Sequence, residues 1–220
     1  MDTLQTIIFF WAPQLLRGAR VTISLTVLAV SAGLVLSLFL ALGKMSKNIV
    51  LSKLCSAYVF FFRGTPLLMQ LFFIYYALPQ IIPALTINNR FFAAFIAFSL
   101  NSAAYCAEII RAAIQSIDKG QFEASRVLGL SFAQTMRFVI IPQSVRRLIP
   151  PVSNEFIMML KDVSLVSMIA LVDITRATGN IFNSTGSALV YIPALILYLI
   201  ITAVFSFIFR KLEKKYSFYG

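Results

Sequence analysis

The sequence predicts an all-α, polytopic membrane protein with about five transmembrane helices. Hydrophobic residues make up 60% of the 220-residue chain and charged residues only 12%. Several apolar runs reach the roughly 20 residues that a helix needs to cross a bilayer. No stretch between these runs is long enough to build a separate water-facing core. We therefore expect a single transmembrane domain over residues 1–220.

Apolar runs and the polar breaks between them set the limits of the predicted spans. In chain order, the expected spans are residues 21–43, 66–78 (within 54–83), 91–111, 142–160 and 189–209. The second run is interrupted at Thr65-Pro66, which marks a helix start or a kink because proline has no amide proton. Residues 161–183 are too polar for an ordinary crossing, and a re-entrant or surface hairpin fits them better.

The positions of the basic residues predict the orientation of the chain. With the loop 44–53, the segment 113–137 and the C-terminal tail in the cytoplasm, 13 Lys and Arg residues lie inside and four outside. This arrangement places the amino terminus outside. Arg17 and Arg20 are then external, and we expect them on an interfacial amphipathic helix over residues 4–19.

Composition also excludes several classes of function. The net charge of +11 could suit nucleic acid, but the cations lie in loops that face an anionic leaflet, so we expect membrane lipid and no nucleic acid as partner. The chain contains no histidine, which argues against hydrolytic triads and histidine-based metal sites. We expect no catalytic residues and no metal. Cys55 and Cys106 lie in apolar segments and are interpreted as small buried hydrophobic residues.

The segment 113–137 is a polar island with small residues at regular intervals. Ala124, Ser125 and Gly129 would let another backbone approach closely, and Glu123 lies near the start of a short predicted helix, where the helix dipole favours a carboxylate. A short exposed helix of this kind is suited to docking. The alternative is an ordinary amphipathic cytoplasmic loop.

Polar residues inside the predicted spans are the candidates for substrate binding, because their exposure to lipid is costly. Asn101, Tyr105 and Glu108 recur on one face of the third helix, next to Ser102. On the fourth helix the candidates are Asn154, Glu155, Lys161 and Asp162. Carboxylates suit an amino group, and the lysine and the amides suit a carboxylate, so the set fits a zwitterion. Alternatively, these residues only join helices, with Glu108 paired to Arg111.

Several motifs occur in the order that importer permeases of the ATP-binding cassette (ABC) family show. Glu123-Ala124-Ser125, Gly129 and Val139-Ile140-Ile141-Pro142 resemble the EAA motif of that family, although Ser125, Val139 and Ile141 replace the more usual Ala, Ile and Leu. Further segments resemble the polar amino-acid branch of the family. They are Arg63-Gly64-Thr65-Pro66-Leu67-Leu68, Ala107-Glu108-Ile109-Ile110-Arg111-Ala112, Ile141-Pro142-Gln143-Ser144, Asn154-Glu155 and Leu160-Lys161-Asp162-Val163-Ser164-Leu165. The similarity extends over about residues 15–215.

This resemblance implies the fold, partners and location of the protein. It implies a type I ABC importer transmembrane domain in the bacterial cytoplasmic (inner) membrane, with Glu123, Ala124, Ser125 and Gly129 on a coupling helix. The implied partners are two ABC ATPase subunits, a second permease chain in a homodimer or heterodimer, and an extracytoplasmic solute-binding protein. Gly43-Lys44 lacks the phosphate-binding loop pattern, so ATP is expected on the ATPase subunits and no cofactor on this chain.

We therefore interpret the chain as the permease subunit of an ABC importer for a polar amino acid. One rival is a secondary transporter or channel driven by an ion gradient, with Glu108, Glu155 and Asp162 as ion sites. The absence of an internal inverted repeat weighs against it. A membrane-embedded enzyme is a third class, but the sequence offers no plausible catalytic set.

Overall fold

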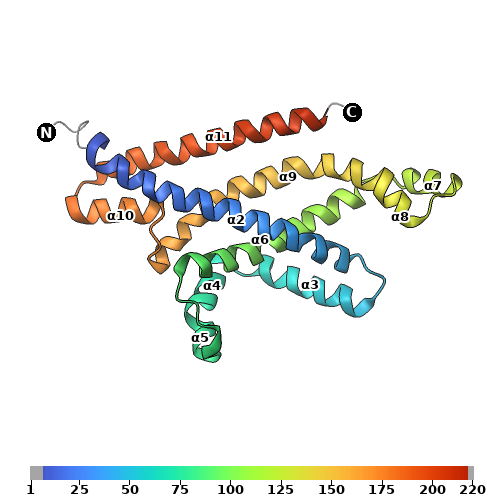
Figure 1. Cartoon of the computed structure of the whole chain (residues 1–220), viewed down its shortest axis with the longest axis horizontal. Helices are drawn as coiled ribbons and strands as arrows, with labels where there is room; N and C mark the ends of the chain where they lie inside the picture. The colour runs from blue at the N-terminus through green and yellow to red at the C-terminus, as the bar shows by residue number, and fades with distance from the viewer. Residues whose placement is uncertain (1–6, 218–220) are drawn as a thin grey trace.

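A computed structural model describes residues 7–217, and within this range the chain consists of helices and short connections, without a strand. The long helices run roughly along one axis, with α7 and α8 at one end and α10 at the other (Figure 1). The elements, in order, are η1 (Ile7–Trp11), α2 (Ala12–Lys44), α3 (Ile49–Gly64), α4 (Leu67–Phe72), η2 (Phe73–Ala77), α5 (Leu78–Ile81), η3 (Pro83–Leu85), α6 (Arg90–Gln115), α7 (Lys119–Val127), α8 (Phe132–Thr135), η4 (Met136–Ile140), α9 (Ile141–Asp162), η5 (Val163–Ile169), α10 (Ile174–Thr185), η6 (Ala188–Val190) and α11 (Tyr191–Ser217).

Three helical stretches in the described part of the chain are long and apolar enough to cross a membrane. They are Phe9–Lys44, Arg90–Gln115 and Ala188–Tyr216. The first begins earlier than the predicted span 21–43, because a proline in the first turn of α2 starts the helix and no breaker follows it. Arg17 and Arg20 therefore lie within this continuous helix and not on a separate interfacial one. Residues 4–6 of that predicted interfacial helix lie outside the described residues.

The second predicted span is bent by 106° between α3 and the helical arm Leu67–Ile81, and the pair together forms a fourth candidate crossing. The break lies at Thr65-Pro66, where the sequence predicts it. Thr65 has extended backbone angles (φ −118°, ψ 148°), so the α3 hydrogen-bond ladder ends there. Residues 66–78 form only the shorter arm, whereas α3 is the longer one. The reason is the side-chain cap of Asn48, which starts α3 well before residue 54.

Helix α9 is long enough to cross a bilayer but is less apolar than the other spans. It contains 22 residues, which correspond to about 33 Å. Arg146, Arg147 and Glu155 lower its hydropathy, so it is absent from the helices that satisfy the apolar criterion among the described residues. It packs against α6 and α11. Beyond it, the chain continues as η5 and α10, a broken path in the region 161–183.

Small residues bring α2 and α6 into close contact. A Cβ atom built on Gly33 of α2 would lie 2.8 Å from the Cβ atom of Ser102 and 3.1 Å from the Ala103 nitrogen. The facing surface of α6 is rich in fully buried alanines, namely Ala93, Ala94, Ala97, Ala103, Ala104 and Ala107. Small side chains of this kind let membrane helices pack backbone to backbone. The α2–α6 pair therefore forms the centre of the fold.

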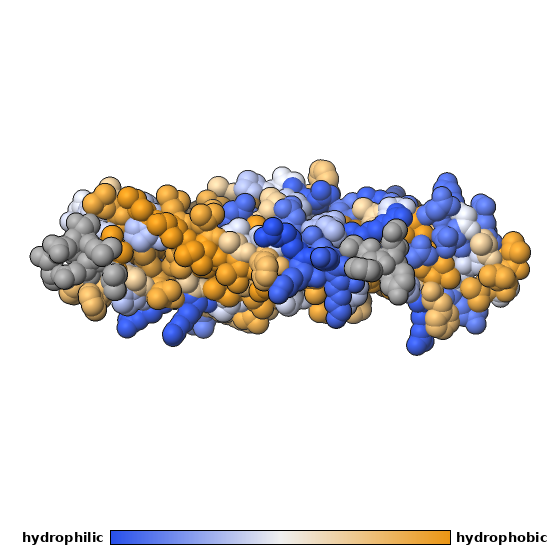
Figure 2. Space-filling view, turned by 90° about the horizontal axis from the view of Figure 1, so that it is seen from above, coloured by the Kyte–Doolittle hydropathy of each residue, from blue (hydrophilic) through white to orange (hydrophobic). Residues whose placement is uncertain are grey.

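Helix α11 presents a continuous apolar surface on the outside of the bundle. Only 11% of its most hydrophobic stretch is buried. The exposed side chains include Leu195, Ile196, Leu199 and Ile200. Figure 2, seen from the side of α11, shows this hydrophobic surface giving way to hydrophilic side chains towards the C-terminal end. This distribution fits a helix that faces lipid along most of its length and meets the aqueous phase at its basic end.

Candidate functional site

The first candidate site is the short helix α7 at one end of the molecule. Asp118 caps its start by accepting a 2.6 Å hydrogen bond from the Gly120 amide. Gly129 follows its end with φ +72°, a left-handed conformation that favours glycine because other residues would place a Cβ against the backbone. Glu123, Ala124 and Gly129 are exposed, as docking requires, whereas Ser125 is buried.

An apolar patch surrounds the end of α7. We call Val127, Leu128, Phe132 and Phe138 the α7 patch. Val127 is 88% exposed and Leu128 77% exposed, and both phenylalanines are exposed as well. Exposed apolar patches bordered by polar residues are typical of surfaces that contact another protein or the membrane. The sequence analysis identified the small residues of this helix but not the patch.

Hydrogen bonds from the long helix α9 reach Gln121 of α7 and Ser116, the residue that caps the end of α6. Gln143, in the first turn of α9, donates to Oε1 of Gln121 on α7 at 3.2 Å and to the Val139 carbonyl at 2.9 Å. Arg147, one turn further along α9, donates to the Ser116 hydroxyl at 2.8 Å, and also to the Ser116 carbonyl. Gln143 therefore links α7 to α9 directly, whereas Arg147 links α9 to the end of α6.

A cluster of opposite charges joins the last turns of α2 and α3 to α6. Glu108 of α6 is paired with Lys44 of α2, and its other oxygen lies 2.7 Å from Arg111 and 4.0 Å from Arg63 of α3. The Arg63 guanidinium also lies over the Tyr105 ring, 5.2 Å from its centroid. Glu108 is therefore engaged in joining three helices, and its predicted partner Arg111 is one of several.

The candidate residues of α9 have a different environment. Glu155 is only 9% exposed and lies beside Ser102, within the electrostatic field of Asp162 and Arg63. Ser102 stands near the middle of the 26-residue α6, so this contact is near the centre of the membrane. Asn154, Lys161 and Asp162 are exposed along the same helix, and the Asn154 amide donates to the Met158 sulfur at 3.7 Å.

Neither Glu155 nor Asp162 is paired with a basic side chain. In the part of the chain that the structure describes, the ion pairs within 4.0 Å include three with Glu108 and none with Glu155 or Asp162. An intramembrane carboxylate without a basic partner is energetically costly and is characteristic of a binding site. The structure thus divides the predicted carboxylates into Glu108, which has basic partners, and Glu155 and Asp162, which have none within 4.0 Å in the described residues.

Asn101 contacts a residue that the sequence analysis did not select. Its amide nitrogen donates to Oε1 of Gln70 on α4 at 2.9 Å and to the Phe62 carbonyl at 3.2 Å. Arg63 was likewise left without a role, although it contacts Tyr105 and Glu108. The sequence does hold one signal for both residues, which is their position beside the Thr65-Pro66 break. Arg63 precedes this break, and Gln70 follows it by about one turn.

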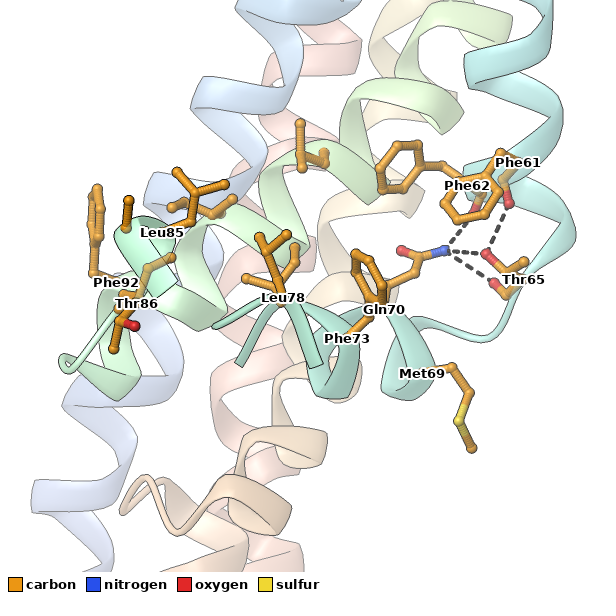
Figure 3. A pocket seen from close by; sticks show the side chains of 15 residues that line it. Phe61, Phe62, Thr65, Met69, Gln70, Phe73, Leu78, Leu85, Thr86 and Phe92 are labelled. Atoms are coloured by element: carbon orange, nitrogen blue, oxygen red, sulfur yellow. Dashed lines mark hydrogen bonds between the residues drawn. The ribbon is translucent and has the colours of Figure 1, made fainter. Parts of the chain in front are cut away.

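A cavity of about 740 Å³ lies between the bent arm and the first half of α6. Figure 3 shows its walls, in which Phe61, Phe73, Leu78 and Phe92 are prominent and Gln70 is one of few polar groups. Such walls offer little to a charged amino acid. Glu155 and Asp162 are not among the lining residues, so we place the candidate substrate site at the α6–α9 contact instead.

Comparison with known proteins assigns the family. The model of the family described as "Binding-protein-dependent transport system inner membrane component" matches residues 33–218. The chain belongs to this family. It is 39% identical to the glutamine transport system permease protein of Escherichia coli (strain K12) over 204 residues, which cover 92% of this chain and 93% of that protein. It is 42% identical over 212 residues to the L-cystine transport system permease protein of Bacillus subtilis (strain 168), covering 96% and 89%.

Solved structures agree with this assignment. The chain is similar to an amino acid ABC transporter crystallised with histidines, with a TM-score of 0.90, 40% identity and coverage of 98% and 99%. An inward-facing methionine ABC transporter shares the fold, with a TM-score of 0.78 at 21% identity. The predicted ABC importer permease of the amino-acid type, its helical membrane fold and its inner-membrane location are therefore confirmed. As an inner-membrane component of a binding-protein-dependent system, the permease is a translocation subunit that works with other proteins.

Proposed function

We propose that this permease binds a polar, zwitterionic amino acid near the middle of the membrane, at the contact between α6 and α9. Glu155 and Asp162 receive the ammonium group, assisted by Asn154, and Ser102 lies beside Glu155. Lys161 and Arg63 are the nearby cations suited to the carboxylate. This orientation follows from charge alone, because each end of the zwitterion meets the opposite sign.

The observation that carries the proposal is the contrast between the carboxylates. Glu108 has basic partners on three helices, whereas Glu155 is buried without one in the described part of the chain. A buried charge without a partner is unfavourable by several kcal/mol, which a bound ammonium group would offset. Glu108 and Tyr105 then hold Arg63 in place and do not contact the substrate themselves.

The relatives support a polar amino acid as cargo. One relative is named for glutamine transport and another for L-cystine transport. Both compounds carry the α-ammonium and α-carboxylate groups that the α6–α9 contact would recognise, but their side chains differ. We propose glutamine as the first substrate to test, since its neutral amide requires no further charge at the site.

ATP hydrolysis is proposed to occur on separate partner subunits. Two ATPase subunits would seat on the α7 patch of this chain and of a second permease chain, identical or homologous. ATP would be bound there, with no cofactor on this chain. Closure of the ATPase pair would move α7, and the bond between Gln121 and Gln143 would pass the motion to α9, which carries Glu155 and Asp162. A solute-binding protein would deliver the amino acid from outside.

Equilibrium binding tests this proposal most simply. The complex of permease and ATPase, purified without binding protein, is titrated with radiolabelled glutamine, and cystine, arginine and glutamate are added as competitors. We expect saturable glutamine binding that Glu155→Gln and Asp162→Asn each weaken. Binding that is unaffected by both substitutions would show that the substrate site lies elsewhere. Uptake into proteoliposomes driven by a proton gradient without ATP would instead support the rival secondary transporter.

A further inference from the structure

The elbow between α3 and α4 contains carbonyl groups that no helix satisfies. Pro66 has no amide proton, so the Phe62 carbonyl, four residues earlier, loses its helical donor. Thr65 is extended, and its carbonyl also lies outside a helix. Backbone groups at membrane depth must find partners within the protein, because lipid supplies none. The sequence Arg63-Gly64-Thr65-Pro66 therefore creates a requirement for a donor.

Gln70 meets this requirement from the first turn of the next helix. Its amide nitrogen donates to the Phe62 carbonyl at 2.9 Å, the Thr65 carbonyl at 3.1 Å and the Thr65 hydroxyl at 2.8 Å. Figure 3 shows the side chain pointing into the elbow with these bonds dashed. The Thr65 hydroxyl donates in turn to the Phe61 carbonyl at 2.8 Å. Gln70 is 4% exposed, so water does not compete for it.

These acceptors fix which way the Gln70 amide faces. Carbonyl oxygens can only accept, so the nitrogen of Gln70 must face the elbow and its oxygen must face α6. That oxygen accepts the 2.9 Å bond from Asn101, whose nitrogen also donates to the Phe62 carbonyl at 3.2 Å. Both amide hydrogens of Asn101 are thereby used. The carboxamide oxygen of Asn101 is therefore the group that can still accept a hydrogen bond from another molecule.

We infer that Gln70 is a positioning residue for substrate recognition, acting through Asn101. By holding the Asn101 nitrogen in the elbow, it leaves Asn101 an acceptor for the ammonium group of the amino acid and no donor for its carboxylate. Asn101 precedes Ser102, the neighbour of Glu155, on α6, and on this inference its free oxygen adds to the negative end of the site. The inference rests on the proposed substrate site. The competing interpretation is that Gln70 and Asn101 only stabilise the elbow.

A double-mutant cycle on the purified complex of permease and ATPase distinguishes the positioning role of Gln70 from a purely structural one. Gln70→Met keeps the length of the side chain without its hydrogen bonds, and Asn101→Ala removes the contact. We expect Gln70→Met to weaken radiolabelled glutamine binding by about fivefold or more in the wild-type background, and to have little further effect once Asn101 is alanine. Ser99→Ala is the control, because Ser99 is on the same helix and its buried hydroxyl has no hydrogen-bond partner.

The outcomes separate this inference from the proposed function. If Glu155→Gln weakens binding but Gln70→Met leaves it unchanged in folded complex, Gln70 is purely structural and the inference is overturned. If Glu155→Gln, Asp162→Asn and Asn101→Ala all leave binding unchanged, the proposed site itself fails. If the complex with Gln70→Met does not assemble, the Thr65→Val variant is used to test the positioning role instead. It removes one acceptor of Gln70 and should weaken binding in the same direction, and unchanged binding would again refute the positioning role.

Discussion

Gln143 of α9 donates a 3.2 Å hydrogen bond to Gln121 of α7, across 22 residues of sequence. Because a second bond from Gln143 holds the Val139 carbonyl, this side chain connects α7, the proposed coupling helix, to the start of the helix that carries Glu155. The sequence places Gln143 directly after Pro142, within the Ile-Pro-Gln motif. In the structure this motif both starts α9 and bonds it to α7.

Loss of this connection should reduce coupling without preventing assembly. Gln143→Met keeps the length of the side chain but removes its donors. A single hydrogen bond contributes about 0.5–1.5 kcal/mol, so we expect the amount of amino acid transported per ATP hydrolysed to fall by about two- to tenfold. ATPase binding should be unchanged. Transport and hydrolysis measured together in proteoliposomes test this, and an unchanged ratio would remove Gln143 from the coupling path.

The α7 patch makes a separate prediction about docking. Leu128→Asp places a charge on a side chain that is 77% exposed, so the permease should insert and fold normally. The same charge would be buried at an ATPase interface, and we expect ATPase affinity to fall at least 10-fold. Copurification and ATPase titration are the measurements. Ser46→Asp, in the α2–α3 loop, is the control for an added charge, and equal behaviour of the two variants would argue against docking on α7.

Close packing of α2 on α6 predicts an unusual sensitivity at a glycine. Gly33→Ala would bring a Cβ within 2.8 Å of Ser102, and we expect it to destabilise the protein by about 1–3 kcal/mol. Gly179→Ala is the matched control, because nothing lies within 4 Å of a Cβ there and alanine favours a helix. Thermal unfolding of the two variants in detergent should separate them, and equal melting temperatures would contradict the packing.

Orientation in the membrane can be tested by cysteine labelling. Lys119→Cys, at the start of α7, should be shielded from an impermeant thiol reagent in intact cells, whereas Asn183→Cys, near the end of α10, should react. Both residues are exposed. The background is Cys55→Ala and Cys106→Ala, which removes two free and buried cysteines. The reversed pattern of labelling would show that the amino terminus lies inside.

Local signals predicted much of the fold. Apolar runs indicated where α2, α6 and α11 lie, and Pro66 indicated the break in the second span. The bounds were less accurate, because caps such as Asn48 extend helices beyond their apolar cores. The contacts of the candidate site were harder to predict from the sequence. Helical periodicity placed Glu108 and Asn101 on one face, but it could not show that Lys44 or Gln70 would contact them. Those contacts join segments that are 64 and 31 residues apart.

The most direct test of the account compares one substitution at two sites. Glu155→Gln and Glu108→Gln are made in the same purified complex of permease and ATPase, and glutamine binding and thermal unfolding are measured on both. Since a hydrogen bond to a charged group contributes about 1.5–3 kcal/mol, Glu155→Gln should weaken binding on the order of 10- to 100-fold with little change in melting temperature. Glu108→Gln should lower the melting temperature because Lys44 and Arg111 lose their partner, with glutamine affinity nearly unchanged in the folded complex. A Glu155→Gln complex that melts earlier but binds glutamine as tightly as the wild type would contradict the account.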